Sequence, residues 1–165
     1  MLGLSFSAFT TLHVVISLIG IATGLVVLWG MLNGRGVGGL TALFLATTIL
    51  TNVTGFMFPL NQLQPSHFVG LISLVVLAIA LFALYGKGLS GGWRPIYIVT
   101  ATVALYLNVF VGVVQAFQKF GFLQALAPTQ SETSFVIAQL VVLVLFAILG
   151  YLALKRYHPA SGASA

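Results

Sequence analysis

The chain contains almost no acidic residues and no cysteine. Glu132 is the one acid among 165 residues, and aspartate is absent. Without thiols the chain forms neither disulfides nor thiolate metal sites, and CxxC redox chemistry is excluded. Without a second carboxylate it lacks the paired acid and base that many hydrolases use, and GxSxG and HExxH motifs are missing too. We therefore do not expect a stand-alone enzyme.

Charged residues of either sign are scarce. Only 4% of the residues are Asp, Glu, Lys or Arg, whereas a soluble domain carries about 25%. Hydrophobic residues make up 60%, and the mean hydropathy is +1.17. Water cannot be the solvent for most of this surface, so the sequence predicts an integral membrane protein with the lipid bilayer as its partner. The basic residues stand singly between apolar runs, and we expect no nucleic-acid binding.

Several apolar runs are long enough to cross a membrane. A bilayer core of roughly 30 Å needs about 20 apolar residues in a helix. The runs of about this length are residues 12–32, 38–58, 66–86, 93–117 and 134–154. We therefore predict an all-α integral membrane protein with five transmembrane helices, which form a single membrane domain over residues 1–158. Residues 159–165 are expected to form a short disordered cytoplasmic tail.

The distribution of basic residues predicts the orientation. Arg35, Lys87, Arg94, Lys155 and Arg156 fall on one side of the predicted membrane, and Lys119 alone falls on the other. Positively charged loops favour the cytoplasm. This asymmetry predicts a protein of the cell (inner) membrane with its N-terminus outside, on the periplasmic side, and its C-terminus in the cytoplasm.

Two segments of the chain resemble each other. "HVVISLIGIATGLVVLWGMLNGRGVGG" and "HFVGLISLVVLAIALFALYGKGLSGG" both begin with histidine and end in a glycine-basic-glycine turn. Each is followed by a threonine-bearing helix with one asparagine, Asn52 or Asn108. Repeats of equal orientation imply an axis along the membrane normal. We therefore predict that spans 1–4 form a pseudo-twofold four-helix bundle of two related hairpins, to which the fifth helix is added. His13 and His67 would then lie at matching depth on opposite sides.

The stronger polar side chains concentrate in the predicted outer half of the membrane. Polar groups inside a bilayer usually face protein or a cavity. Asn108, Gln115 and Lys119 follow one helical stripe toward the outer lip. The residues that we assign to an outward-facing His/amide site are His13, His67, Asn52, Asn108, Gln115, Lys119 and Gln139. The amides among them could also serve as hydrogen-bond bridges between helices.

The two histidines admit two cofactor interpretations. Each lies near the start of a predicted helix, where the positive end of the helix dipole favours a neutral imidazole, the form that ligates metals or accepts a hydrogen bond. In the first interpretation His13 and His67 are the axial ligands of one haem b iron, and Lys119 contacts a propionate. In outline this arrangement resembles the bis-histidine b-type membrane cytochromes, which implies electron transport. In the second, the histidines and amides bind a quinone head group.

A third interpretation gives the histidines a structural role. The protein is then an accessory or anchor subunit of a respiratory or other redox membrane complex. We favour this interpretation because so small a chain without a soluble domain usually needs partners, either other membrane-protein subunits or further copies of itself. A small-solute transporter is a further alternative.

Overall fold

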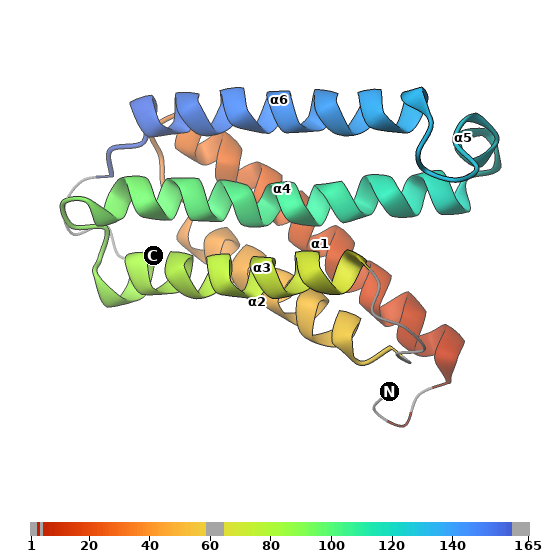
Figure 1. Cartoon of the computed structure of the whole chain (residues 1–165). Helices are drawn as coiled ribbons and strands as arrows, with labels where there is room; N and C mark the ends of the chain where they lie inside the picture. Colours follow the sequence, from red (N-terminus) through yellow and green to blue (C-terminus); the bar gives the residue numbers. More distant parts are fainter. Residues whose placement is uncertain (1–2, 4, 59–64, 160–165) are drawn as a thin grey trace.

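The computed structural model describes residues 3, 5–58 and 65–159, and within these ranges it contains helices and no strand. The elements are α1 Phe6–Leu32, α2 Gly38–Phe56, α3 Pro65–Leu81, the π-helical turn η1 Phe82–Gly86, α4 Trp93–Lys119, α5 Gly121–Leu126 and α6 Thr133–Arg156. Five helices are long and apolar enough to cross a membrane (Figure 1). The prediction of an all-α fold with five such helices is confirmed.

Two features differ from the predicted spans. The first helix begins at Phe6 instead of residue 12, because the Ser5 side chain caps it by accepting a hydrogen bond from the N–H of Ala8. The segment between the fourth and fifth predicted spans contains the short helix α5. Residues 59–64, around the end of the second predicted span and before the third, and the tail residues 160–165 lie outside the described residues.

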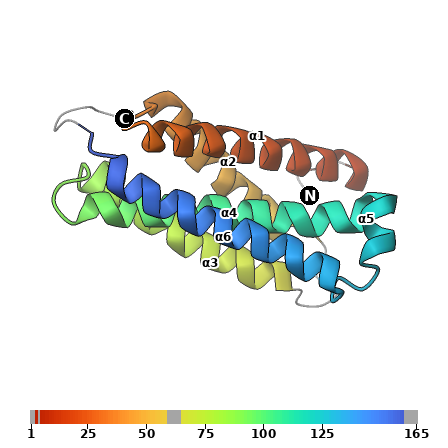
Figure 2. The ribbon, with the colours of Figure 1, turned by 90° about the horizontal axis from the view of Figure 1, so that it is seen from above.

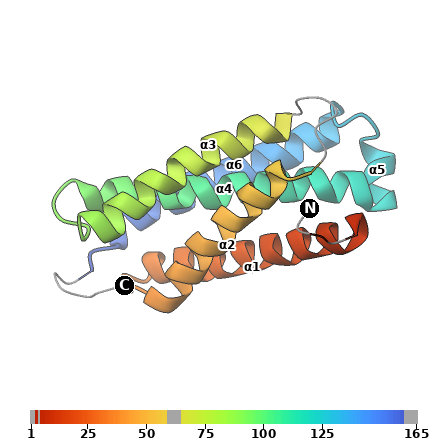
Figure 3. The ribbon, with the colours of Figure 1, turned by 90° about the horizontal axis from the view of Figure 1, so that it is seen from below.

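Helices α1–α4 pack in a ring, and α6 packs against the outside of this ring. α1 packs on α2, α2 on α3, α3 on α4, and α4 on α1, while α6 contacts α4 and α1. From above, α6 lies over α4 with α1 beside them, and from below α2 lies diagonally between α1 and α3 (Figures 2 and 3). This order leaves α6 on the outside of the ring, where most of its side chains are exposed.

The core lies where α1, α2 and α4 meet. Phe44 and Leu105 are almost fully buried there. A Cβ atom at Gly24 would stand 2.5 Å from Leu105 Cδ1 and 2.8 Å from the Phe44 ring, so only glycine lets the three helices approach this closely. In lipid, such close van der Waals packing replaces the hydrophobic effect as the force that joins helices.

The two ends of the bundle differ in chemistry. One end holds the α1–α2 turn, the α3–α4 turn and the last turn of α6, and we call it the basic end. Arg94 donates there to the carbonyls of Leu154 and Tyr157, and Arg156 donates to the carbonyl of Leu32. These guanidinium groups satisfy carbonyls that the helix ends leave open. The opposite end, which we call the α5 end, holds α5 and the start of α1.

The predicted orientation can be tested by cysteine labelling, because the natural chain has no cysteine. Ser90→Cys places an exposed thiol at the basic end, and Gln124→Cys places one on α5. We expect a membrane-impermeant maleimide to modify only the Gln124→Cys protein in spheroplasts, and both proteins after lysis. Modification of the Ser90→Cys protein in intact spheroplasts would show that the basic end faces outward, opposite to the prediction.

Candidate functional site

His13 is bonded to the neighbouring helix. Its Nδ1 atom lies 2.7 Å from Thr54 Oγ1 on α2. The Thr54 oxygen also lies 2.7 Å from the Leu50 carbonyl oxygen, to which it donates its single hydroxyl proton. With the Thr54 proton on the Leu50 carbonyl, Thr54 accepts from His13 Nδ1–H, whereas in the other tautomer Nδ1 is the acceptor. In the first tautomer a neutral imidazole presents a lone pair at Nε2, which can accept a proton or bind a metal.

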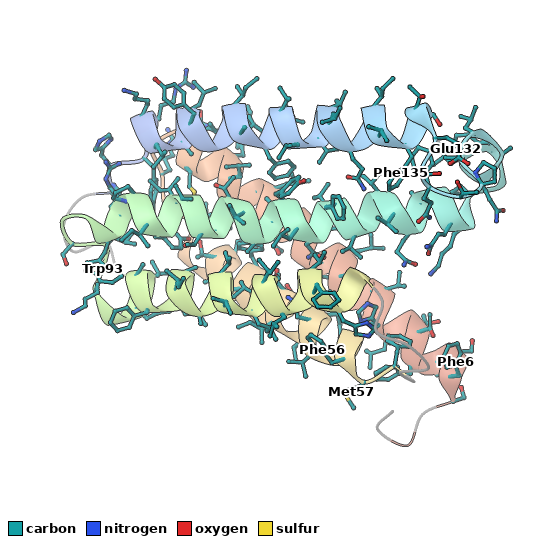
Figure 4. The ribbon with its side chains drawn as sticks, viewed as in Figure 1. Phe6, Phe56, Met57, Trp93, Glu132 and Phe135 are labelled. Atoms are coloured by element: carbon teal, nitrogen blue, oxygen red, sulfur yellow. The ribbon has the colours of Figure 1, made fainter. Side chains whose placement is uncertain are left out.

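Aromatic side chains surround this histidine. The Phe58 ring meets the His13 ring edge-on, with 5.2 Å between centroids, and Phe58 also contacts Phe9 and Phe6 at 5.0 and 6.0 Å. Figure 4 labels Phe6 near the start of α1, in the same corner of the molecule as the end of α2. His13 thus lies beside an aromatic cluster.

His67 lies on the other side of the same helix end. It occupies the first turn of α3, and its ring centroid is 5.9 Å from that of Phe56, the last residue of α2. The two histidines therefore flank the end of α2, His13 from α1 and His67 from α3. The described residues contain no group of three or more His or acidic side chains that could hold a metal ion. A haem between two histidines, which needs only these two protein ligands, stays a prediction.

Asn52 joins α2 to α3. Its amide nitrogen donates to the Thr48 carbonyl at 2.8 Å and to Ser73 Oγ at 3.0 Å. Ser73 is buried in the middle of the apolar sequence of α3, whose other hydroxyl residue, Ser66, lies in the first turn. The bond connects two helices at a depth where water is scarce, so it stabilises their contact.

Asn108 faces α1 near the middle of the bundle. The residue is 8% exposed, and a Cβ atom at Gly20 would stand 3.1 Å from Asn108 Nδ2 and 3.3 Å from the hydroxyl oxygens of Thr47 and Thr48. Three polar groups thus converge on the small surface of Gly20. Within the described part of the chain, Nδ2 has no hydrogen-bond partner. A donor left unpaired in an apolar interior is costly, so this position favours a water molecule or another acceptor.

Of the remaining predicted site residues, one bonds to another helix inside the bundle and two are exposed at its α5 end. Gln139 Nε2 donates to the Phe110 carbonyl at 3.2 Å and so joins α6 to α4, while its Oε1 is buried without a partner among the described residues. Gln115 and Lys119 are exposed at the α5 end. The stripe on α4 therefore runs from buried Asn108 to an exposed lip, as the helical spacing predicts.

Sequence reasoning missed three polar residues that matter here. Thr54 and Ser73 are the partners of His13 and Asn52, and Thr102 has a buried hydroxyl without a partner in the described part. A serine in the middle of an apolar span is a signal for Ser73. Thr54 and Thr102 look like the other threonines of the chain, most of which bond to their own helix.

The chain matches no known protein family, and no curated protein or solved structure is detectably similar to it. Function must therefore be argued from the contacts themselves. Those contacts place a histidine, two amides that each have a buried atom without a partner among the described residues, and an exposed lysine along α1, α4 and α6, in the α5-end half of the bundle.

The acid Glu132 organises the loop before α6. Desolvation opposes ionisation, but hydrogen bonds from the Thr129 hydroxyl and from the N–H groups of Thr129 and Ser131 outweigh it and lower the pKa of Glu132. A lowered pKa in the folded state means that the ionised group stabilises the loop above its unfolded pKa of about 4.3, and that this contribution disappears as the pH falls through the folded value.

We predict a pH-dependent loop. Amide hydrogen exchange of the segment 127–134 should be slower in the natural protein than in Glu132→Gln at about pH 7, and this difference should shrink toward about pH 3. Comparison of the two proteins at each pH removes the intrinsic pH dependence of exchange. A difference that stays constant over this range would contradict the assignment of the hydrogen bonds to the carboxylate.

Proposed function

We propose that the protein is an accessory or anchor subunit of a respiratory or other redox complex in the inner membrane, with its α5 end facing outward. The observation that carries this proposal is the use of the predicted site residues as bridges between helices. His13 joins α1 to α2, Asn52 joins α2 to α3, and Gln139 joins α6 to α4. Bonds of this kind contribute about 0.6–2 kcal/mol each and favour one fixed arrangement of helices.

The outer surface offers room for neighbouring subunits. α6 stands outside the ring of α1–α4 and exposes large apolar side chains along its whole length. The buried Oε1 of Gln139 on the same helix has no partner among the described residues. A second membrane chain that packs along α6 would cover this apolar surface.

The repeat prediction belongs to the same proposal. Each asparagine of the repeat faces the first helix of the other hairpin: Asn52 of α2 bonds Ser73 of α3, and Asn108 of α4 faces Gly20 of α1. The order of the helix contacts, in which α2 packs on α3 and α4 packs on α1, is compatible with these contacts between the two hairpins. These reciprocal contacts support a pseudo-twofold relation between the α1–α2 and α3–α4 hairpins.

A second candidate function is favoured by the tautomer of His13. In the tautomer in which Nδ1 donates to Thr54, Nε2 offers a lone pair, which suits a quinol hydroxyl or a haem iron. Lys119, exposed at the end of α4, would supply a positive charge for a quinone oxygen or a haem propionate. The complex subunit would then carry electrons through its own cofactor, with His13 and His67 as the protein ligands of a haem.

Purification from native membranes in a mild detergent tests both candidates. We expect a larger membrane subunit to co-purify in fixed stoichiometry, and we expect His13→Ala to retain it if the histidine is only a helix bridge. A protein that purifies without any partner would contradict the accessory role.

The same preparation reveals a cofactor. A Soret band or an extractable quinone that is present in the natural protein and lost in His13→Ala or His67→Ala would establish the second candidate. Ser17→Ala is the matched control, since Ser17 lies one turn after His13 and donates to its carbonyl. A colourless, quinone-free preparation of the natural protein from cells supplied with haem would exclude the second candidate function.

A further inference from the structure

A groove lies between α4 and α6 on the side of the molecule away from the histidines. Its volume is about 230 Å³, and Val99, Thr102 and Val103 of α4 and Phe146, Gly150 and Tyr151 of α6 line it. A Cβ atom at Gly150 would stand 3.2 Å from Thr102 Cγ2, so glycine allows the helices to approach while the space beside them stays open. The lining is almost entirely hydrocarbon.

Positive charge is concentrated at the mouth of the groove toward the basic end. The Lys155 ammonium lies 5.5 Å from the centroid of the Tyr151 ring, which lines the groove. Leu154 lines it too, and Arg94 donates to the Leu154 carbonyl. The chain has a single acidic residue, Glu132, which lies at the opposite end of α6 from Lys155. Figure 4 shows Glu132 and Trp93, the neighbour of Arg94, at opposite ends of the molecule. Among the described residues, no acidic side chain lies at this end to balance the cations at the mouth.

We propose that this groove binds an anionic phospholipid. One acyl chain occupies the apolar groove between α4 and α6, and the phosphate lies against Lys155 and Arg94. The apolar lining suits a hydrocarbon chain, and the unbalanced cations suit a negatively charged head group rather than a zwitterionic one. This site is separate from the histidines and does not depend on the proposed redox role.

The test is lipid retention by the purified protein, measured by native mass spectrometry after addition of phosphatidylglycerol or phosphatidylcholine. We expect the natural protein to retain phosphatidylglycerol preferentially, at one molecule per chain. Lys155→Gln should weaken phosphatidylglycerol binding about fivefold, the effect of one basic residue near a charged head group, and should leave phosphatidylcholine unchanged. Ala147→Phe, which fills the groove from an exposed lining position, should reduce the retention of both lipids.

Lys87→Gln is the matched control. It removes a cation from the same end of the bundle, but Lys87 lies over the rings of Phe82 and Trp93, away from the groove. We expect this variant to bind phosphatidylglycerol as the natural protein does. Equal retention of the two lipids by the natural protein, equal losses in Lys155→Gln and Lys87→Gln, or full retention in a folded Ala147→Phe protein would each overturn the proposal.

Discussion

A membrane interior offers no water to satisfy polar groups, and this constraint governs the whole structure. Each amide, hydroxyl or imidazole within the bundle must find a partner in the protein or pay the full cost of desolvation. His13 finds Thr54, Asn52 finds Ser73, and Gln139 finds the Phe110 carbonyl. Each of these bonds joins two helices, so the polar residues add directional contacts to the close apolar packing that joins the helices.

The same constraint separates the two ends of the molecule. At the basic end, arginine side chains bond to the last carbonyls of α1 and α6, so charge there also completes the helix ends. The α5-end half of the bundle contains His13 and the exposed Gln115 and Lys119. The proposed cofactor site would lie near the α5 end, whereas the proposed lipid groove opens toward the basic end.

The sequence predicts the spans well because length and hydropathy alone decide whether a helix crosses a membrane. It fails where a local contact decides: Ser5 extends α1 by capping it, and six residues form α5 in a segment that reads as a loop. It also cannot give the partners of His13 and Asn52. Helices that are apolar on all sides carry no stripe that shows which face packs inward, so the pairing with Thr54 and Ser73 depends on a rotation that only the structure reveals.

The central claim is that polar bonds between helices hold this bundle together, and the His13–Thr54 bond tests it most directly. A double-mutant cycle with His13→Ala and Thr54→Val, read as the free energy of reversible unfolding in detergent, should give a coupling of about 0.6–2 kcal/mol. The same cycle with Thr51→Val should give none, because the Thr51 hydroxyl donates to the Thr47 carbonyl of its own helix. Equal coupling for the two threonines, or none for Thr54, would contradict this account.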